Sequence, residues 1–180
     1  MDTPTRRTFV VYVEDRPGVL NRVASLFRRR AYNIISLNVG RTHEPGISRM
    51  TMVVEADNDT ARIMEANLYK LVNVLSVEDI THTPAVTLDL ALIKARILPG
   101  QRAEALDLAE RFRARVTDVS DDAMMFEITG TQEKIMEFAG ILEQYGIAEM
   151  VQTGTVSMTR GSEGYASRVA HNHRPDVDAA

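Results

Sequence analysis

Hydrophobic positions change their spacing several times along the chain, and each spacing predicts one element. Residues 8–13 are β-branched and aromatic without a helical period, which predicts a buried strand. Asp15 is a good N-cap and Pro17 suits a first helical turn, so we expect a helix from there to about Arg30. Its apolar positions recur at helical spacing: Val19, Leu20, Val23, Leu26 and Phe27.

Alternating residues, typical of strands, follow this helix. Residues 33–39 and 50–54 alternate on either side of a turn at Pro45-Gly46. In the first of these strands the residues expected on one face are Ile35, Leu37 and Val39. Residues 57–59 offer caps for a second helix, and a last strand is expected at about 74–82. The apolar positions of that second helix are Ile63, Met64, Leu68, Leu71 and Val72. The order β-α-β-β-α-β is the ferredoxin-like pattern.

The same order of elements returns in the second half. The strands expected there are 87–97, 116–119, 124–128 and 147–158. A turn at Pro99-Gly100 precedes a helix, and Thr131 caps a second one. The apolar helix positions are Ala105, Leu108, Ala109, Phe112, Ile135, Phe138 and Leu142. The fold class is therefore α+β, with two ferredoxin-like domains whose antiparallel sheets carry helices on one face.

Four segments follow from this organisation. Residues 1–7 are expected to be a flexible N-terminus, 8–83 the first domain and 84–160 the second. Residues 161–180 lack periodicity and are rich in small and polar side chains, which predicts a disordered tail.

Composition narrows the function classes. The chain has 180 residues and 44% hydrophobic content, enough for a core in two small domains. It has no cysteine, which excludes disulfides and thiolate metal sites. No signal peptide or membrane-length apolar run is present, so we expect a cytoplasmic protein without a membrane partner. The net charge is −4 without a basic face, which argues against a nucleic-acid partner.

Motifs for catalysis are missing from the sequence. It contains no GxSxG, HExxH or GxxxxGK segment, and its four histidines do not stand at metal-ligand spacing inside an expected element. We therefore expect no catalytic residue, no metal site and no cofactor on this chain.

The most informative stretch is the first helix start. Exposed amides at a helix start attract a carboxylate, and Gly18 leaves the backbone open to close approach. Asp15 can accept from an ammonium group, and Asn33 can donate and accept. Ile34 or Val39 would supply an apolar wall. Together these groups suit a free amino acid, although a plain cap, a plain turn and a strand-entry residue explain the same letters.

Longer segments resemble one family. They are EDRPGVLNRVASLFRRRAYNIISLNVG from residue 14, SRMTMVV at 48–54, LYKLVNVLSV at 68–77, LDLALIKARI at 88–97, FRARVTDVS at 112–120 and GTVSMTRG at 154–161. All are similar to the small regulatory subunit of acetohydroxyacid synthase (acetolactate synthase), in the same order. The resemblance covers about residues 8–161.

The resemblance implies an N-terminal ACT domain for effector binding and dimerisation, and a C-terminal ACT-like domain. It implies a homodimer that assembles with a large catalytic subunit, which holds thiamine diphosphate, magnesium and FAD. The small subunit would activate that partner and confer feedback inhibition by valine, or a related branched-chain amino acid, in branched-chain amino acid biosynthesis. The effector residues by motif position are Asp15, Gly18, Val19, Leu20 and Asn21 of one copy, and Asn33 and Ile34 of the other.

This chain departs from the family pattern at two of those positions. Many relatives carry Asn in place of Asp15, and Ser, Thr or Ala in place of Asn21. An ionised Asp15 can accept from an ammonium group but cannot donate to a carboxylate, which it would repel.

Other readings stay open at this point. A ligand-responsive transcription regulator, or a sensor of another small amino acid, could use the same β-α-β-β-α-β unit, although no helix-turn-helix follows it. An RNA-binding module would need stacking aromatics on the third strand, and SRMTMVVE has none. A free-standing enzyme is a further reading. Arg49 and residues 68–75 are candidate contacts for a catalytic subunit.

Overall fold

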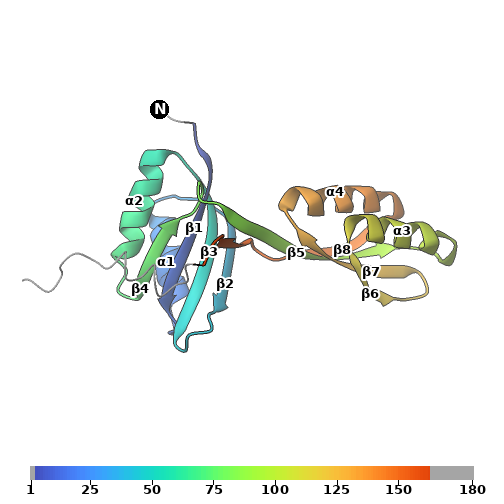
Figure 1. Cartoon of the computed structure of the whole chain (residues 1–180), viewed down its shortest axis with the longest axis horizontal. Coiled ribbons are helices and arrows are strands. Elements are labelled where there is room, and N and C mark those ends of the chain that lie inside the picture. Colours follow the sequence, from blue (N-terminus) through green and yellow to red (C-terminus); the bar gives the residue numbers. More distant parts are fainter. Residues whose placement is uncertain (1–2, 163–180) are drawn as a thin grey trace, which may run out of the picture. The chain divides into compact units, whose positions relative to one another are not determined.

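The computed structural model describes residues 3–162 and divides into two compact units. The elements of the first unit are β1 (Thr5–Glu14), α1 (Val19–Arg29), β2 (Ile34–Arg41), β3 (Ile47–Ala56), α2 (Asn58–Tyr69) and β4 (Val74–Asp79) (Figure 1). Their order is the predicted β-α-β-β-α-β, which confirms the ferredoxin-like fold class.

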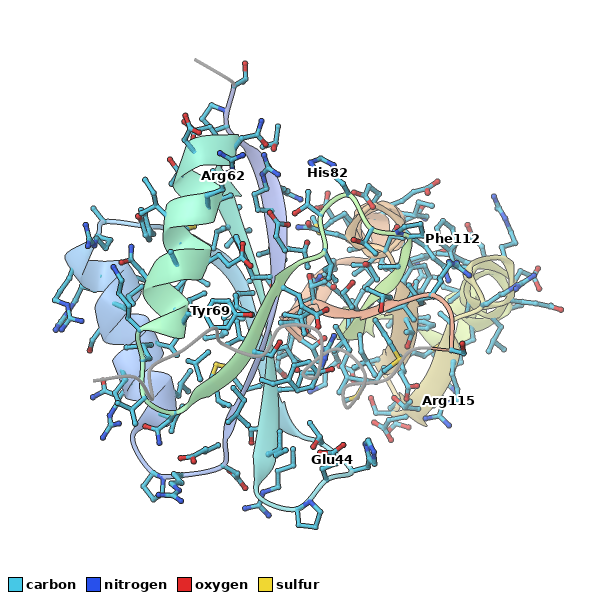
Figure 2. All side chains as sticks on the ribbon, turned by 60° about the vertical axis from the view of Figure 1, so that its left-hand side comes forward. Glu44, Arg62, Tyr69, His82, Phe112 and Arg115 are labelled. Carbon is cyan, nitrogen blue, oxygen red and sulfur yellow. The ribbon has the colours of Figure 1, made fainter. Side chains whose placement is uncertain are left out.

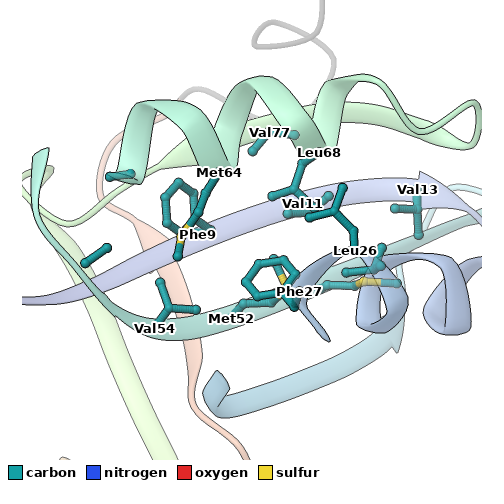
Figure 3. Close-up of a cluster of buried hydrophobic side chains, with 14 of the residues drawn as sticks. Phe9, Val11, Val13, Leu26, Phe27, Met52, Val54, Met64, Leu68 and Val77 are labelled. Atoms are coloured by element: carbon teal, nitrogen blue, oxygen red, sulfur yellow. The ribbon is translucent and has the colours of Figure 1, made fainter. Parts of the chain in front are cut away.

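An antiparallel sheet with the strand order β2-β3-β1-β4 forms the body of the first unit. Residues of β1 alternate between its faces, so that Phe9, Val11 and Val13 point toward the helices. They meet Leu26 and Phe27 of α1 and the buried positions of α2 (Figure 3). Burial of these alternating and helical apolar positions is what holds the two layers together.

The first strand begins earlier than the sequence indicates. Residues 1–7 were expected to be flexible, but Thr5 to Arg7 pair with β3, and this part of the expectation is wrong. Arg7 is 6% exposed, and its guanidinium contacts Asn58 and Asp79. Polar contacts from α2 and β4, which apolar periodicity does not report, therefore extend the strand.

A β-bulge changes which residues of β2 face the core. The register with β3 shifts between Ile34 and Ser36. Ile34 and Leu37 consequently pack against the core, whereas Ile35 is 39% exposed. The expectation that Ile35, Leu37 and Val39 share one face is thus wrong for Ile35. It is correct for Leu37 and Val39, which lie opposite Met52 and Met50 on β3.

The second unit repeats the order with its own core. Its elements are β5 (Ala85–Arg96), a 3₁₀ turn η1 (Pro99–Gln101), α3 (Arg102–Phe112), β6 (Arg115–Val119), β7 (Ala123–Gly130), α4 (Gln132–Leu142), η2 (Glu143–Tyr145) and β8 (Ile147–Gln152). The strands pair antiparallel in the order β6-β7-β5-β8. Phe126 and Phe138 meet edge to face in the core, with ring centroids 5.6 Å apart. Thr131 caps α4, as predicted.

The end of the described chain returns to the first unit. One strand was expected over residues 147–158, but the structure has β8 and a separate strand β9 (Val156–Thr159), which pairs with β5. Residues 157–162 group with the first unit, not with the second as expected. From residue 163 onward, the tail that was expected to be disordered lies outside the described residues.

Arg49 fixes this returning segment. Its guanidinium donates to the carbonyl of Ser157, to the Thr51 hydroxyl at 2.8 Å and to the Tyr12 hydroxyl at 3.3 Å. It also lies 5.7 Å from the centroid of the Tyr12 ring, within cation–π range. The side chain suggested as a contact for a catalytic subunit is therefore engaged within its own chain.

Candidate functional site

The start of α1 is open. Gly18 is the N-cap residue and has φ +84°, a left-handed conformation that glycine adopts without a steric penalty. No side chain caps the helix here, whereas Asp57 and Thr131 cap α2 and α4 by accepting backbone N–H bonds. The N–H of Val19 donates to the carbonyl of Arg16 at 3.4 Å, whereas the next two amides, of Leu20 and Asn21, meet no side-chain cap among the described residues. These amides lie at the positive end of the helix dipole.

This geometry corrects the expected cap. Asp15 is not the N-cap, and Pro17 lies in a turn before the first helical residue. The left-handed backbone at Gly18 breaks the helical path, because helical residues need a negative φ. The carboxylate of Asp15 consequently pairs with Arg41 instead of capping the helix.

Asp15 is tied to the hairpin formed by β2 and β3. Its carboxylate Oδ2 lies 2.9 Å from Nε of Arg41, the last residue of β2. Its backbone N–H donates to the carbonyl of Gly46 at 2.7 Å. Glu44 lies in the same hairpin loop (Figure 2). Two contacts therefore hold Asp15 against this hairpin.

A polar network supports the same end of the sheet from the other side. Asn73 donates from Nδ2 to Oε2 of Glu14 at 2.6 Å and accepts on Oδ1 from Nη1 of Arg22 at 2.5 Å. Arg16 lies 3.2 Å from the Glu14 carboxylate. This network links β1 and α1 to the residue preceding β4. Sequence reasoning missed Glu14, Arg22, Asn73 and Arg41, and only the position of Glu14 beside Asp15 could have pointed to one of them.

The other predicted residues occupy different environments. The side chain of Val19 is buried in the core, so this residue presents only its backbone at the helix start. Leu20 is 44% exposed, and Asn21 is exposed as well. Asn33 is exposed and Ile34 is partly buried, both at the start of β2.

The two halves of the predicted site do not meet within one chain. Both β1 and β2 run antiparallel to β3, so they run in the same direction. Arg41 contacts Asp15 at the end of β2, whereas Ile34 begins that strand. Seven residue steps of extended chain span about 23 Å. One copy therefore presents Asp15 and Ile34 at opposite ends of its sheet.

A hollow of about 420 Å³ lies at the other end of the sheet, between α2, β1 and β4. It is lined by Arg7, Asn58, Asp59, Ala61, Arg62, Glu65 and Asp79. Figure 2 places Arg62 on α2, and His82, whose Nε2 lies 3.2 Å from Nη1 of Arg7, after β4. Burial raises the pKa of Glu65, and the nearby Asp79 carboxylate raises it further.

Glu65→Gln should stabilise the protein at neutral pH. Folding raises the pKa of Glu65, so this carboxyl contributes most to stability below its unfolded pKa, and that contribution is lost as pH rises through the folded pKa. We expect a modest rise in melting temperature at pH 7 that shrinks below pH 4, since Glu65 is only partly buried. Thermal melts of Glu65→Gln and of the exposed control Glu137→Gln, from pH 3.5 to 8, would check this. An equal gain in both variants would point to net charge alone.

The fold and its open helix start define a class of protein, that of the ACT domains. A family model described as the AHAS small subunit-like ACT domain matches residues 9–76, and a model for the small subunit of acetolactate synthase matches residues 88–161. The chain belongs to the family of acetolactate synthase small subunits.

Individual relatives agree with that assignment. A probable acetolactate synthase small subunit from Archaeoglobus fulgidus is 44% identical over 88% of this chain and 99% of its own length. The acetolactate synthase small subunit of Mycolicibacterium smegmatis is 44% identical over 90% of this chain and 95% of its own length. A crystal structure of the Thermotoga maritima small subunit has 35% identity and a TM-score of 0.81, covering 88% of this chain and 99% of that one. The family resemblance expected from the sequence motifs is confirmed.

The helices described over residues 3–162 include none that is long and apolar enough to cross a membrane.

Proposed function

We propose that this chain binds a branched-chain amino acid, foremost valine, at the start of α1, and thereby regulates the catalytic subunit of acetolactate synthase. In this proposal the chain activates that subunit, confers feedback inhibition on it and performs no catalytic step itself. Thiamine diphosphate, magnesium and FAD belong to the catalytic partner. The observation that carries the proposal is the helix start at Gly18, which has no side-chain cap and follows Asp15 by three residues.

The chemistry of this end suits a zwitterion. The amides of Leu20 and Asn21 at the start of α1 would donate to the ligand carboxylate, and Asp15 would accept from its ammonium group. The exposed Leu20 side chain offers an apolar surface to a branched side chain. One copy therefore supplies polar contacts at both ends of an amino acid and one apolar contact.

A second copy would complete the site through the edge of the sheet. β2 is the edge strand of the order β2-β3-β1-β4 (Figure 1). Its Ile35 and Val39 side chains are apolar and exposed. Protein sheets usually protect an edge with lysine or proline, and β2 has neither. Such an edge is suited to pairing with another copy of itself.

Antiparallel pairing of two β2 strands also explains the separation within one chain. If the strands pair about their midpoint, Ile34 of one copy lies opposite Arg41 of the other. Ile34 and Asn33 then approach the α1 start and Asp15 of the other copy, because Arg41 contacts Asp15. Two equivalent sites arise, each built from both copies.

Regulation then follows from a difference in affinity. An amino acid that bridges two copies favours the arrangement in which both halves of the site contact it. The free energy that couples the ligand to the catalytic subunit is at most the difference in ligand binding free energy between the two arrangements, typically ~1–3 kcal/mol.

Calorimetry tests the proposal directly. We expect valine to bind the purified full chain, with leucine and isoleucine as graded competitors and the charged amino acids aspartate and lysine as negative controls. Mixing the chain with a catalytic subunit should raise acetolactate formation, and valine should lower it again. Absence of binding by every branched-chain amino acid would overturn the effector proposal, and tight binding of a different small amino acid would redirect it.

A further inference from the structure

The ion pair between Asp15 and Arg41 assigns a role to a residue that the sequence motifs did not single out. We propose that Arg41 is a positioning residue of the effector site, one that compensates the charge of Asp15 so that the site accepts an α-amino acid. This inference rests on the proposed function, because it concerns the regulation of that same site.

The electrostatic problem is set by Asp15. Asp15 lies three residues before Gly18, at the helix start that would receive the carboxylate of an amino acid. Two like charges a few ångströms apart oppose each other, and the opposition strengthens when a second copy excludes water. An uncompensated Asp15 would hold the ammonium group while weakening the hold on the carboxylate.

Arg41 resolves this problem through geometry. The distance of 2.9 Å from its Nε to Oδ2 of Asp15 makes a charge-assisted hydrogen bond. One oxygen of Asp15 is engaged in this way, which leaves the other for an ammonium group. The backbone bond from Asp15 to Gly46 holds the pair in place, because Gly46 closes the hairpin that follows Arg41.

Neighbouring charges are already committed elsewhere. Among the arginines at this end, Arg16 contacts Glu14 and Arg22 contacts Asn73. His43 lies 3.9 Å from Glu44 in the hairpin loop. Within the described part of the chain, the cation set against the Asp15 carboxylate is therefore Arg41.

Position also favours a role for Arg41 beyond that of an ordinary surface ion pair. Its side chain is 84% exposed in one copy, and an exposed pair contributes little to stability by itself. Arg41 ends the edge strand β2, so midpoint pairing with a second copy places it where the two halves of the site join. Covering by that copy would strengthen the ion pair by removing water.

A double-mutant cycle tests the inference with valine as the probe. We expect Arg41→Ala to weaken valine binding about tenfold, which corresponds to about 1.4 kcal/mol. In an Asp15→Asn background the same substitution should change the affinity less than about twofold, since no charge remains to be compensated. Arg41→Lys, which keeps the charge, should recover part of the loss. Sedimentation velocity on each variant would verify that the oligomeric state is unchanged.

Each outcome separates the two proposals. A wild-type chain that binds no branched-chain amino acid would overturn the proposed function. Wild-type binding that Arg41→Ala weakens equally in both backgrounds, or does not weaken, would overturn the role of Arg41 and leave the proposed function standing. A change of oligomeric state in Arg41→Ala that accounts for its loss of affinity would likewise overturn the compensating role.

Discussion

Gly18→Asp should weaken valine binding at least thirtyfold while the protein remains folded. The substitution places a second carboxylate at the start of α1, where the ligand carboxylate would meet the amides of Leu20 and Asn21. Loss of even one charge-assisted hydrogen bond is worth about 2 kcal/mol, which corresponds to that factor. In reconstitution with a catalytic subunit, the variant should still activate but resist inhibition by valine.

Gly18→Asn is the matched control for this experiment. A Cβ at this position meets nothing within 4 Å, so both side chains fit, and both share the strain of φ +84°. That strain costs about 1 kcal/mol and is smallest for Asn and Asp. Isothermal titration of the two variants, together with their thermal melts, would separate charge from strain. If Gly18→Asp binds valine as well as the wild type, the site is not at the start of α1.

Local patterns were sufficient to predict the order of elements in both units. The β-branched and aromatic run of β1, the alternation in β3 and the helical spacing in α1 and α2 each depend on near neighbours. The strand residues Phe9 and Val11 and the helix residue Met64 are accordingly buried in one core. A helix cap could also be predicted where the capping side chain bonds an amide a few residues away. Asp57 does so by accepting from the N–H of Thr60 at 2.7 Å. Such features lie within a few residues of one another and can be read from the sequence.

Features that depend on distant partners could not be predicted. The salt bridge of Asp15 joins residues 26 positions apart, and the bond from Asn73 to Glu14 joins residues 59 apart. The bulge in β2 arises from its register with β3, which the letters of β2 do not contain. The predicted helix start was wrong for the same reason, since Asp15 is a good cap in isolation but is held by a strand that comes later in the chain.

These differences matter for how the candidate site is described. From the sequence, Asp15 was a capping residue whose charge stood against a ligand carboxylate. The structure gives this charge a partner and leaves the start of α1 without a side-chain cap. The candidate site is accordingly a helix start without a side-chain cap, preceded by a paired carboxylate. The apolar side chain proposed to complete it, Ile34, lies at the opposite end of the same sheet.

The combined substitution Ile35→Lys and Val39→Lys should convert the proposed dimer to monomers and abolish valine binding. Both side chains are exposed on the edge strand β2, at 39% and 40%. Pairing of two β2 strands would bring four lysines per dimer into one seam, and burying unpaired charges there costs several kcal/mol. Sedimentation velocity should give a monomer at concentrations where the wild type is a dimer, and calorimetry should detect no valine binding.

A control variant with the same chemistry distinguishes this edge from general surface effects. Ile63 on α2 and Met136 on α4 are exposed to a similar degree, at 51% and 54%, and Ile63→Lys with Met136→Lys should leave both the dimer and valine binding intact. A dimeric Ile35→Lys and Val39→Lys variant would exclude β2 as the dimer edge. A monomer that still binds valine with wild-type affinity would instead exclude a shared site, because Asp15 and Ile34 lie too far apart in one copy to hold the same amino acid.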